Sequence, residues 1–186
     1  NWWATPLKYL PAYRNNRFGH PIEPLNLEWA APLGVIQNKL EHNGWKTLDA
    51  KNKLKNIISR FTSLEPQYQT PFLAALYHNK KPSLIMHKPL QEKNVIFEIK
   101  LWPTHIQFSQ QKIPLWVGNI ARHTLSKKHS TIRLHRLNLY DYNLNHQELK
   151  SALGHPHVIR AATKSMAPIP NHVERIRWNG KIIVIR

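Results

Sequence analysis

Histidines are the side chains of this sequence best suited to chemistry, because an imidazole can bind a metal ion or transfer a proton at neutral pH. The chain has twelve of them. His123 ends one expected strand, and His129 and His135 flank the next, so a hairpin would bring the three together near Asp141. This group is the candidate site of a His-dependent phosphoesterase that would work with or without a metal ion. Because acids are scarce around it, we favour structural or surface roles for these histidines and predict no metal site.

Other motifs of catalysis are missing from the sequence. His155 and His157 flank a proline that breaks a helix, so they could share a metal ion only from one face of a strand. The His146-Gln147-Glu148 segment lacks the second histidine of a zinc-protease helix, and there is no Gly-x-Ser-x-Gly or glycine-rich phosphate loop. The absence of cysteine excludes disulfides and thiolate nucleophiles. The sequence thus predicts no catalytic residue and no cofactor.

A strong positive charge is the other chemical feature of the chain. Lys and Arg number 27 against 10 acids, which gives a formal net charge of +17. Such a field attracts phosphate groups, whether of lipid headgroups or of nucleic acid. A general compositional bias toward lysine, with no specific ligand, is the alternative interpretation. The candidate anion-binding residues lie in an expected helix and in the strand-rich half of the chain: Lys53, Lys55, Arg133, Arg136, Arg175 and Arg177.

Nucleic-acid binding is the competing hypothesis for this charge. Aromatic side chains that could stack on bases are available at Trp102, Trp116, Tyr140 and Tyr142. No helix-turn-helix, RRM or KH signature accompanies them. Trp102 and Trp116 also fall within apolar strands, where a core position is favoured. Composition alone does not separate DNA, RNA and anionic lipid.

The elements that must position these residues follow from hydrophobic periodicity. Leu33, Ile36 and Leu40 have helical spacing, and Gly44 follows where a C-terminal cap is favoured. Further helices are expected at residues 51–61, 67–77 and 145–153. Strands, with a bulge near Arg136, are expected at residues 25–29, 83–88, 94–102, 114–123, 131–140 and 158–163.

The end of the chain carries a strong local turn signal. Asn179-Gly180 is favoured in two-residue β-hairpin turns. A hairpin closed by this turn would place Ile176, Trp178 and Ile183 on one face, together with Ile185.

Helices thus gather in the first half of the chain and strands in the second. This segregation predicts an α+β fold with a mostly antiparallel sheet. A length of 186 residues suits a single domain. We expect that domain to span residues 25–186, preceded at residues 1–24 by an irregular, proline-rich entry arm or linker.

The sequence itself contains no membrane-spanning signal. No segment has the roughly 18–20 consecutive apolar residues that cross a bilayer, and no signal peptide is visible. The first residue is Asn1 rather than Met. We therefore expect a fragment or a processed chain, with any membrane segment preceding Asn1.

Several short segments together resemble the LssY C-terminal domain family. The resemblance covers about residues 25–135. Its most characteristic segment is PLWVGN at residues 114–119. The others, in order, are LNLEWAA at residues 25–31 with GW at 44–45, LYHNKKPSL at 76–84 and IKLWP at 99–103.

This resemblance implies a cellular setting more than a reaction. Such domains commonly follow membrane-embedded segments of the DedA-like or phosphatidic-acid-phosphatase-like type, and LssY is named from a type I secretion locus. The implied role is that of a membrane-associated accessory domain of a bacterial envelope protein, which contacts anionic lipid phosphate or a membrane-embedded partner. Family members often carry a His- and Asp-rich stretch after the Trp-Val-Gly strand. Only His129, His135 and Asp141 remain of it here, so no catalytic residue is carried over.

Overall fold

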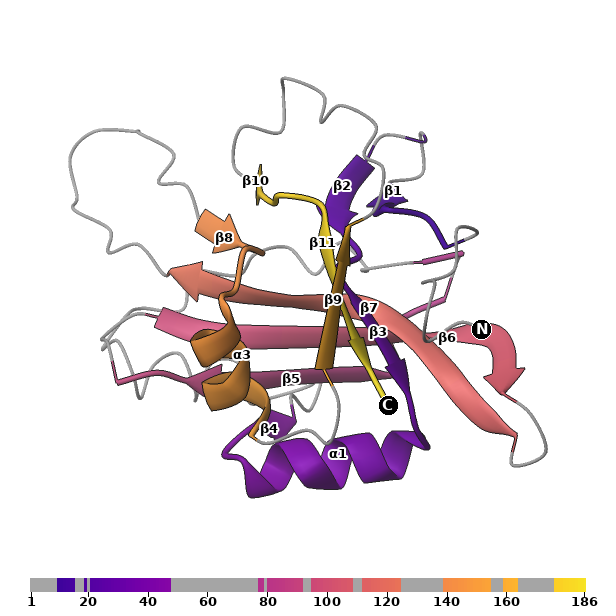
Figure 1. Ribbon diagram of the computed structural model, residues 1–186, viewed down its shortest axis with the longest axis horizontal. Coiled ribbons are helices and arrows are strands. Elements are labelled where there is room, and N and C mark those ends of the chain that lie inside the picture. Colours follow the sequence, from indigo (N-terminus) through magenta and orange to yellow (C-terminus); the bar gives the residue numbers. More distant parts are fainter. Residues whose placement is uncertain are drawn as a thin grey trace.

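The computed structural model describes residues 10–15, 19, 21–47, 77–78, 80–91, 95–108, 112–124, 139–154, 159–163 and 176–186. Within these residues the backbone forms a nine-stranded sheet, a separate two-stranded ribbon and two α-helices (Figure 1). The helices are α1 (Leu33–His42) and α3 (His146–Leu153). The strands are β1 (Tyr13–Asn15), β2 (Pro21–Pro24), β3 (Leu27–Ala30), β4 (Lys46–Thr47), β5 (Leu84–Pro89), β6 (Val95–Phe108), β7 (Ile113–Thr124), β8 (Leu139–Asp141), β9 (Ile159–Thr163), β10 (Ile176–Arg177) and β11 (Lys181–Ile185).

The predicted α+β fold with a mostly antiparallel sheet is confirmed. The main path of the sheet runs β4-β5-β6-β7-β3-β11-β9. Off this path, β8 pairs with the C-terminal end of β7 and with β10. Parallel pairing occurs between β11 and β3 and between β10 and β8. The helix expected at residues 51–61 lies outside the described residues, as do most of the strand expected at 131–140 and the bulge near Arg136. Of the helix expected at 67–77 only Tyr77 is described, and it forms an isolated bridge with Lys80.

The long hairpin of β6 and β7 is the centre of the sheet. Both strands exceed their predicted lengths, and β6 continues past Pro103 to Phe108. The pairing between them is interrupted between Pro103 and Gln107. There Thr104 Oγ1 donates to the carbonyl of Leu115 at 2.6 Å and accepts from the amide of Ile106 at 3.1 Å. This side chain bridges the two strands where their backbones are out of register.

One face of the sheet packs on both helices. Alternation along β6 directs Phe97, Ile99 and Leu101 to this face, which we call the helical face. Ile36 and Leu40 of α1 meet them there, as the helical spacing predicted. Buried residues of α3 join the same apolar cluster: Leu149, Ala152 and Leu153.

The ends of both helices are closed by specific residues. Gly44 follows α1 with a φ of 85°, which confirms the predicted cap, because glycine adopts this left-handed conformation without strain. Asn145 and Glu148 form a capping box at the start of α3. At the other end of α3, Asn43 Nδ2 donates to the carbonyl of Ala152 at 2.6 Å and to that of Ser151 at 3.2 Å. Asn43 therefore joins the end of α1 to the end of α3.

Asn43→Ala is expected to lower the free energy of unfolding by about 1 kcal/mol, because the carbonyls of Ser151 and Ala152 each lose one of two donors and keep the other, Lys88 Nζ and Trp45 Nε1. Chemical denaturation followed by circular dichroism measures the change. The control is Asn38→Ala, since Asn38 is exposed on α1. It is expected to stay within about 0.5 kcal/mol of wild type. Equal stability of the two variants would contradict a role of Asn43 in joining the helices.

The hairpin predicted at Asn179-Gly180 is wrong. Strand β11 pairs in parallel with β3 and antiparallel with β9, not with the residues that precede the turn. Those residues bind elsewhere, since the amide of Tyr142 donates to the carbonyl of Arg177 and the amide of Asn179 donates to Asn143 Oδ1. The cause is the burial of β11, whose residues Ile182–Ile185 are at most 4% exposed. Such a strand needs neighbours on both edges and packing on both faces.

The faces assigned to that hairpin are wrong as well. Ile183 and Ile185 belong to the helical-face cluster. Trp178 packs with Ile182 and Val184 on the opposite face. Alternation along β11 separates these two groups.

The β1–β2 ribbon lies against the opposite face of the sheet (Figure 1). Its Tyr13 ring meets the Trp178 ring edge to face at 5.2 Å between centroids. The Arg14 guanidinium lies 5.8 Å from the centroid of the Trp102 ring. The expectation of an irregular arm is therefore wrong for residues 13–15 and 21–24.

Candidate functional site

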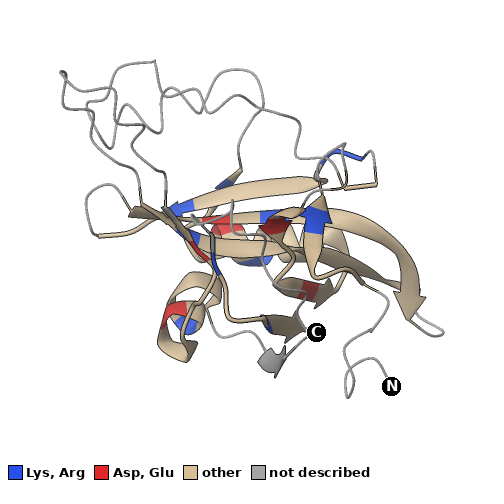
Figure 2. Cartoon of the chain, turned by 90° about the horizontal axis from the view of Figure 1, so that it is seen from above, with Lys and Arg blue, Asp and Glu red and all other residues tan. Residues whose placement is uncertain are grey.

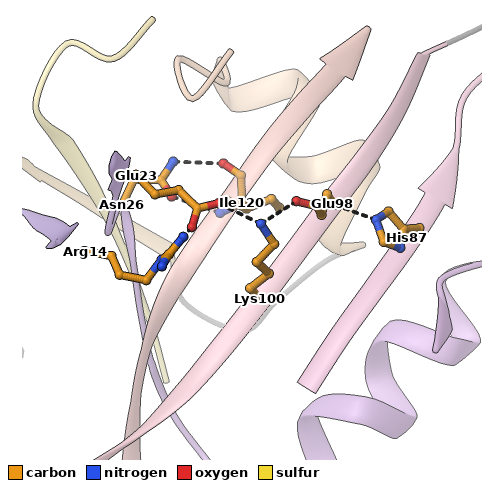
Figure 3. Close-up of polar contacts among 7 residues, drawn as sticks. All are labelled: Arg14, Glu23, Asn26, His87, Glu98, Lys100 and Ile120. Atoms are coloured by element: carbon orange, nitrogen blue, oxygen red, sulfur yellow. Dashed lines mark hydrogen bonds and ion pairs between the residues drawn. The ribbon is translucent and has the colours of Figure 1, made fainter. Parts of the chain in front are cut away.

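The face of the sheet opposite the helices carries a row of buried charged side chains (Figure 3). We call this side the polar face. Glu98 and Lys100 point toward it because they alternate along β6 with the apolar residues of the helical face. His87 lies opposite Glu98 on β5, and Asn119 lies opposite Lys100 on β7. Directly opposed residues share a face, so all four side chains lie on the same side of the sheet.

Three of these side chains and two from the β1–β2 ribbon form a continuous chain of ion pairs. We call it the charge line, and its members in order are Arg14, Glu23, Lys100, Glu98 and His87. From the ribbon, Arg14 Nε donates to Glu23 Oε2 at 2.8 Å. Lys100 Nζ contacts Glu23 Oε1 at 2.6 Å and Glu98 Oε1 at 2.9 Å. His87 Nε2 lies 2.7 Å from Glu98 Oε2. The exposed fractions of these side chains are only 9–14%.

The charge line stays ionised because its members stabilise one another. Burial by itself would raise the pKa of Glu98, but the Lys100 ammonium and the bond from His87 outweigh it and hold that pKa well below its ordinary value of 4.5. Burial likewise opposes the charge of Lys100, and the two carboxylates overcome it and raise its pKa well above 10.5. Two cations thus balance two carboxylates, with an imidazole at the end of the line.

A group of aromatic rings lies beside the charge line. The rings of His123 and Tyr140 are stacked at 4.1 Å between centroids, and Tyr142 follows at 6.4 Å from Tyr140. Burial is the main cause that raises the pKa of both tyrosines, and the negative charge of Glu98 and Glu23 adds to it. Both phenols are therefore protonated at neutral pH.

The side chain of Asn26 connects the backbone segments next to the charge line and the aromatic rings. Its side-chain oxygen accepts from the amide of Ile120 at 2.9 Å. Its side-chain nitrogen donates to the carbonyl of Ile120 at 2.9 Å and to that of Tyr142 at 3.2 Å. Because Asn26 is fully buried, these bonds replace those that water would make. This one side chain joins the start of β3 to the middle of β7 and to the residue that follows β8.

The predicted phosphoesterase residues are described only in part. His123 is buried and faces Tyr140, its register partner. Asp141 instead faces its own register partner, Arg122, whose Nη2 lies 3.3 Å from Asp141 Oδ2. His123 and Asp141 therefore lie on opposite faces of the β7–β8 pair. His129 and His135 lie outside the described residues. Among the described residues, no group of three or more possible metal ligands is found.

Of the predicted anion-binding residues, the structure describes Arg177, which is exposed on β10. Lys53, Lys55, Arg133, Arg136 and Arg175 lie outside the described residues.

The aromatic residues considered for base stacking are mostly internal. Trp102 is 0% exposed and Tyr142 is 4% exposed. Trp116 packs against the helical-face cluster, and its indole nitrogen donates to the carbonyl of Ala31 at 2.9 Å. The preference for core positions of Trp102 and Trp116 is confirmed.

Figure 2 marks the acids and bases of the described residues along the backbone, and the two kinds differ in how exposed their side chains are. Glu41 is the one acid among them that is exposed. The others are buried or paired: Glu23, Glu28, Glu98, Asp141 and Glu148. Exposed cations without an ion pair to a described residue come from several separate elements: Lys46, Lys80, Lys81, Lys112, Lys150, Arg177 and Lys181. The surface charge of this part is therefore positive and largely uncompensated.

No helix in the described part of the chain has the length and apolar character that a membrane crossing requires.

Comparison with known proteins gives one finding. No curated protein and no solved structure matches the chain. A family model described as the LssY C-terminus matches residues 7–169. The match is longer than the resemblance seen in the sequence, and it includes every residue of the charge line. This chain belongs to the LssY C-terminus family.

Proposed function

We propose that this domain is a non-catalytic accessory module of a bacterial envelope protein, and that its basic surface contacts the phosphate groups of anionic lipids beside a membrane-embedded partner. The observation that supports this is the distribution of charge. Five of the acids are neutralised or buried inside the fold, whereas cations such as Lys80, Lys112 and Lys181 stay exposed.

A dispersed set of cations suits a diffuse contact better than a single pocket. Each Lys or Arg near an anionic membrane surface contributes about 1 kcal/mol of attraction. This attraction needs no fixed geometry, so the separate positions of Lys46, Lys112 and Lys181 are compatible with it. Exposed charges are screened within about 8 Å at physiological salt, so the contact must weaken as salt is added.

Binding to lipid vesicles tests the proposal. We expect the chain to sediment with vesicles that contain phosphatidic acid and to stay in solution with vesicles of phosphatidylcholine alone, at low salt. Added salt is expected to release it. Equal recovery with anionic and neutral vesicles would remove the lipid contact from the proposal.

A charge-removal variant makes the test specific. The triple variant Lys80→Gln, Lys81→Gln and Lys112→Gln removes three exposed cations, so its partition onto anionic vesicles is expected to fall by roughly two orders of magnitude at low salt. The matched control changes exposed, non-lysine neighbours, by His78→Gln and His105→Gln. At a pH where histidine is neutral, the control is expected to bind like wild type.

Two other results would redirect the proposal. A salt-dependent gel shift with single- or double-stranded DNA or RNA, without vesicle binding, would make nucleic acid the partner. Hydrolysis of a phosphate ester that is lost in His123→Ala would contradict the non-catalytic role.

A further inference from the structure

The β6–β7 hairpin extends beyond the other strands at one end of the sheet (Figure 1). Strand β5 pairs with β6 only as far as Leu101, and β3 pairs with β7 only as far as Leu115. Beyond these residues the two strands pair with each other as far as Phe108 and Ile113, and with no other described strand. We call this part, residues 102–108 and 112–114, the hairpin end.

Apolar side chains reach the surface at the hairpin end. Phe108 lies directly opposite Ile113, so the two share a face of the hairpin. Together with Ile106 they are partly exposed and pack against an apolar cluster that contains the buried Trp102 and Tyr77. The interior of the fold is therefore continuous here with an apolar surface.

Three exposed lysines lie beside this apolar surface. Lys112 directly precedes Ile113, and Lys80 and Lys81 follow Tyr77, whose backbone exchanges two hydrogen bonds with that of Lys80. None of the three lysines forms an ion pair with a described residue. A lysine can lay its aliphatic stem along apolar surface and keep its ammonium group in a polar layer.

Acids do not offset the charge of these lysines. The sequence contains no Asp or Glu in residues 66–91 or in residues 99–140. Glu23 and Glu28, on the neighbouring strands β2 and β3, are only 7% and 1% exposed, and Glu23 is paired with two cations. The described surface of the hairpin end therefore carries positive charge without exposed carboxylates.

We infer that the hairpin end is the part of the domain that docks on an anionic bilayer, an inference that rests on the lipid contact proposed above. The lysine ammonium groups meet lipid phosphates, and the surface formed by Ile106, Phe108 and Ile113 enters the headgroup region. An apolar surface flanked by lysines suits this interface, because burial of apolar area and attraction to anionic lipid act together. A nucleic acid would use the lysines and leave the apolar surface without a role.

Two matched charge-removal variants test the inference. The first removes the three lysines of this region, by Lys80→Gln, Lys81→Gln and Lys112→Gln. The second removes three exposed lysines from other elements, by Lys46→Gln, Lys150→Gln and Lys181→Gln. The two variants have the same net charge, so a difference between them reports position and not charge.

The two variants are expected to bind anionic vesicles differently. At about 0.1 M salt the screening length is about 10 Å, so a lysine contributes only when it lies close to lipid phosphates. Lys46 lies level with Glu98, roughly 30 Å along β6 from Phe108 at about 3.3 Å per residue. Partition onto vesicles that contain phosphatidic acid should therefore fall by more than about tenfold in the first variant and by less than about threefold in the second.

A fluorescent label gives a second measurement with all lysines in place. Because the sequence has no cysteine, Gln107→Cys and Gln147→Cys each create one labelling position, exposed on the hairpin end and on α3. With an environment-sensitive dye, the label on the hairpin end is expected to shift its emission to shorter wavelength on vesicles that contain phosphatidic acid. The label on α3 is expected not to shift, and vesicles of phosphatidylcholine alone should shift neither.

The outcomes separate this inference from the proposal on which it rests. A wild-type chain that does not bind anionic vesicles removes both. Vesicle binding with equal losses in the two triple variants, or with equal shifts of the two labels, overturns the hairpin end as the docking part and leaves a diffuse contact. Should the first triple variant fail to fold, as circular dichroism would show, the two labels decide.

Discussion

Gly118→Ala is expected to destabilise the domain by about 3–5 kcal/mol, a large share of the stability of an ordinary domain. A Cβ atom at this position would lie 2.0 Å from the backbone oxygen of Lys100 and 2.8 Å from Leu101 Cδ2. The nearest obstacle is backbone of the neighbouring strand, so no side-chain rotation relieves the clash. Strands β6 and β7 would have to separate at the centre of the sheet.

Equilibrium denaturation measures this effect, and Gly34→Ala is its matched control. Gly34 lies in α1, and an added Cβ there meets nothing within 4 Å. Replacement of a helical glycine by alanine should raise stability by about 0.5–1 kcal/mol. The same substitution thus has opposite signs at two positions of one chain. A Gly118→Ala protein as stable as wild type would mean that β6 and β7 do not approach this closely.

The close approach of β6 to β7 also explains why the most characteristic segment of the family resemblance contains a glycine. In the PLWVGN segment, Trp116 and Gly118 lie on β7 opposite Pro103 and Leu101. The glycine admits the β6 backbone, and the tryptophan packs on the helical-face cluster. Both residues thus serve the packing of the sheet, so the motif that identified the family does not by itself indicate a ligand.

Elements with a complete local signal were predictable from the sequence. The apolar spacing of Leu33, Ile36 and Leu40 and the cap at Gly44 specify α1 without reference to the rest of the chain. The same holds for α3, whose capping box lies entirely within Asn145–Glu148. Strand β6 was evident from its alternation.

Pairing between distant strands was not predictable. Asn179-Gly180 carries the local signal of a hairpin, and the structure overrides it because β11 is buried on both faces and pairs with β3 and β9. The run Ile182–Ile185 without a polar residue was the available clue, since such strands are typical of the interior of a sheet.

The charge line was missed for a related reason. Glu98 and Lys100 alternate with apolar residues on β6, a pattern that usually indicates a face in water. Their burial depends on Arg14 and Glu23, which arrive from the ribbon far away in the sequence. The spacing itself was informative, because opposite charges two residues apart on a strand lie on one face and can pair.

Lys100→Met is expected to lower the free energy of unfolding by about 3–5 kcal/mol, since it leaves buried carboxylates without their shared cation. Chemical denaturation at neutral pH measures the loss. Lys150→Met, at an exposed position of α3, is the control and should stay within about 0.5 kcal/mol of wild type. Addition of Glu98→Gln to Lys100→Met should restore part of the stability, because it removes a buried carboxylate that has lost its cation, while Glu23 keeps its pairing with Arg14.

The pH dependence distinguishes a lost ion pair from lost packing in Lys100→Met. In wild type the lowered pKa of Glu98 contributes stability that is complete above the ordinary value of 4.5 and is lost as the pH falls below it. Without Lys100, the burial that opposes ionisation is expected to raise the pKa of Glu98 above its unfolded value, so the folded variant binds a proton more readily and is stabilised as the pH falls. The deficit of the variant should therefore shrink from neutral to acid pH. A deficit of constant size across that range would show that the Lys100 side chain contributes by packing and not by its charge.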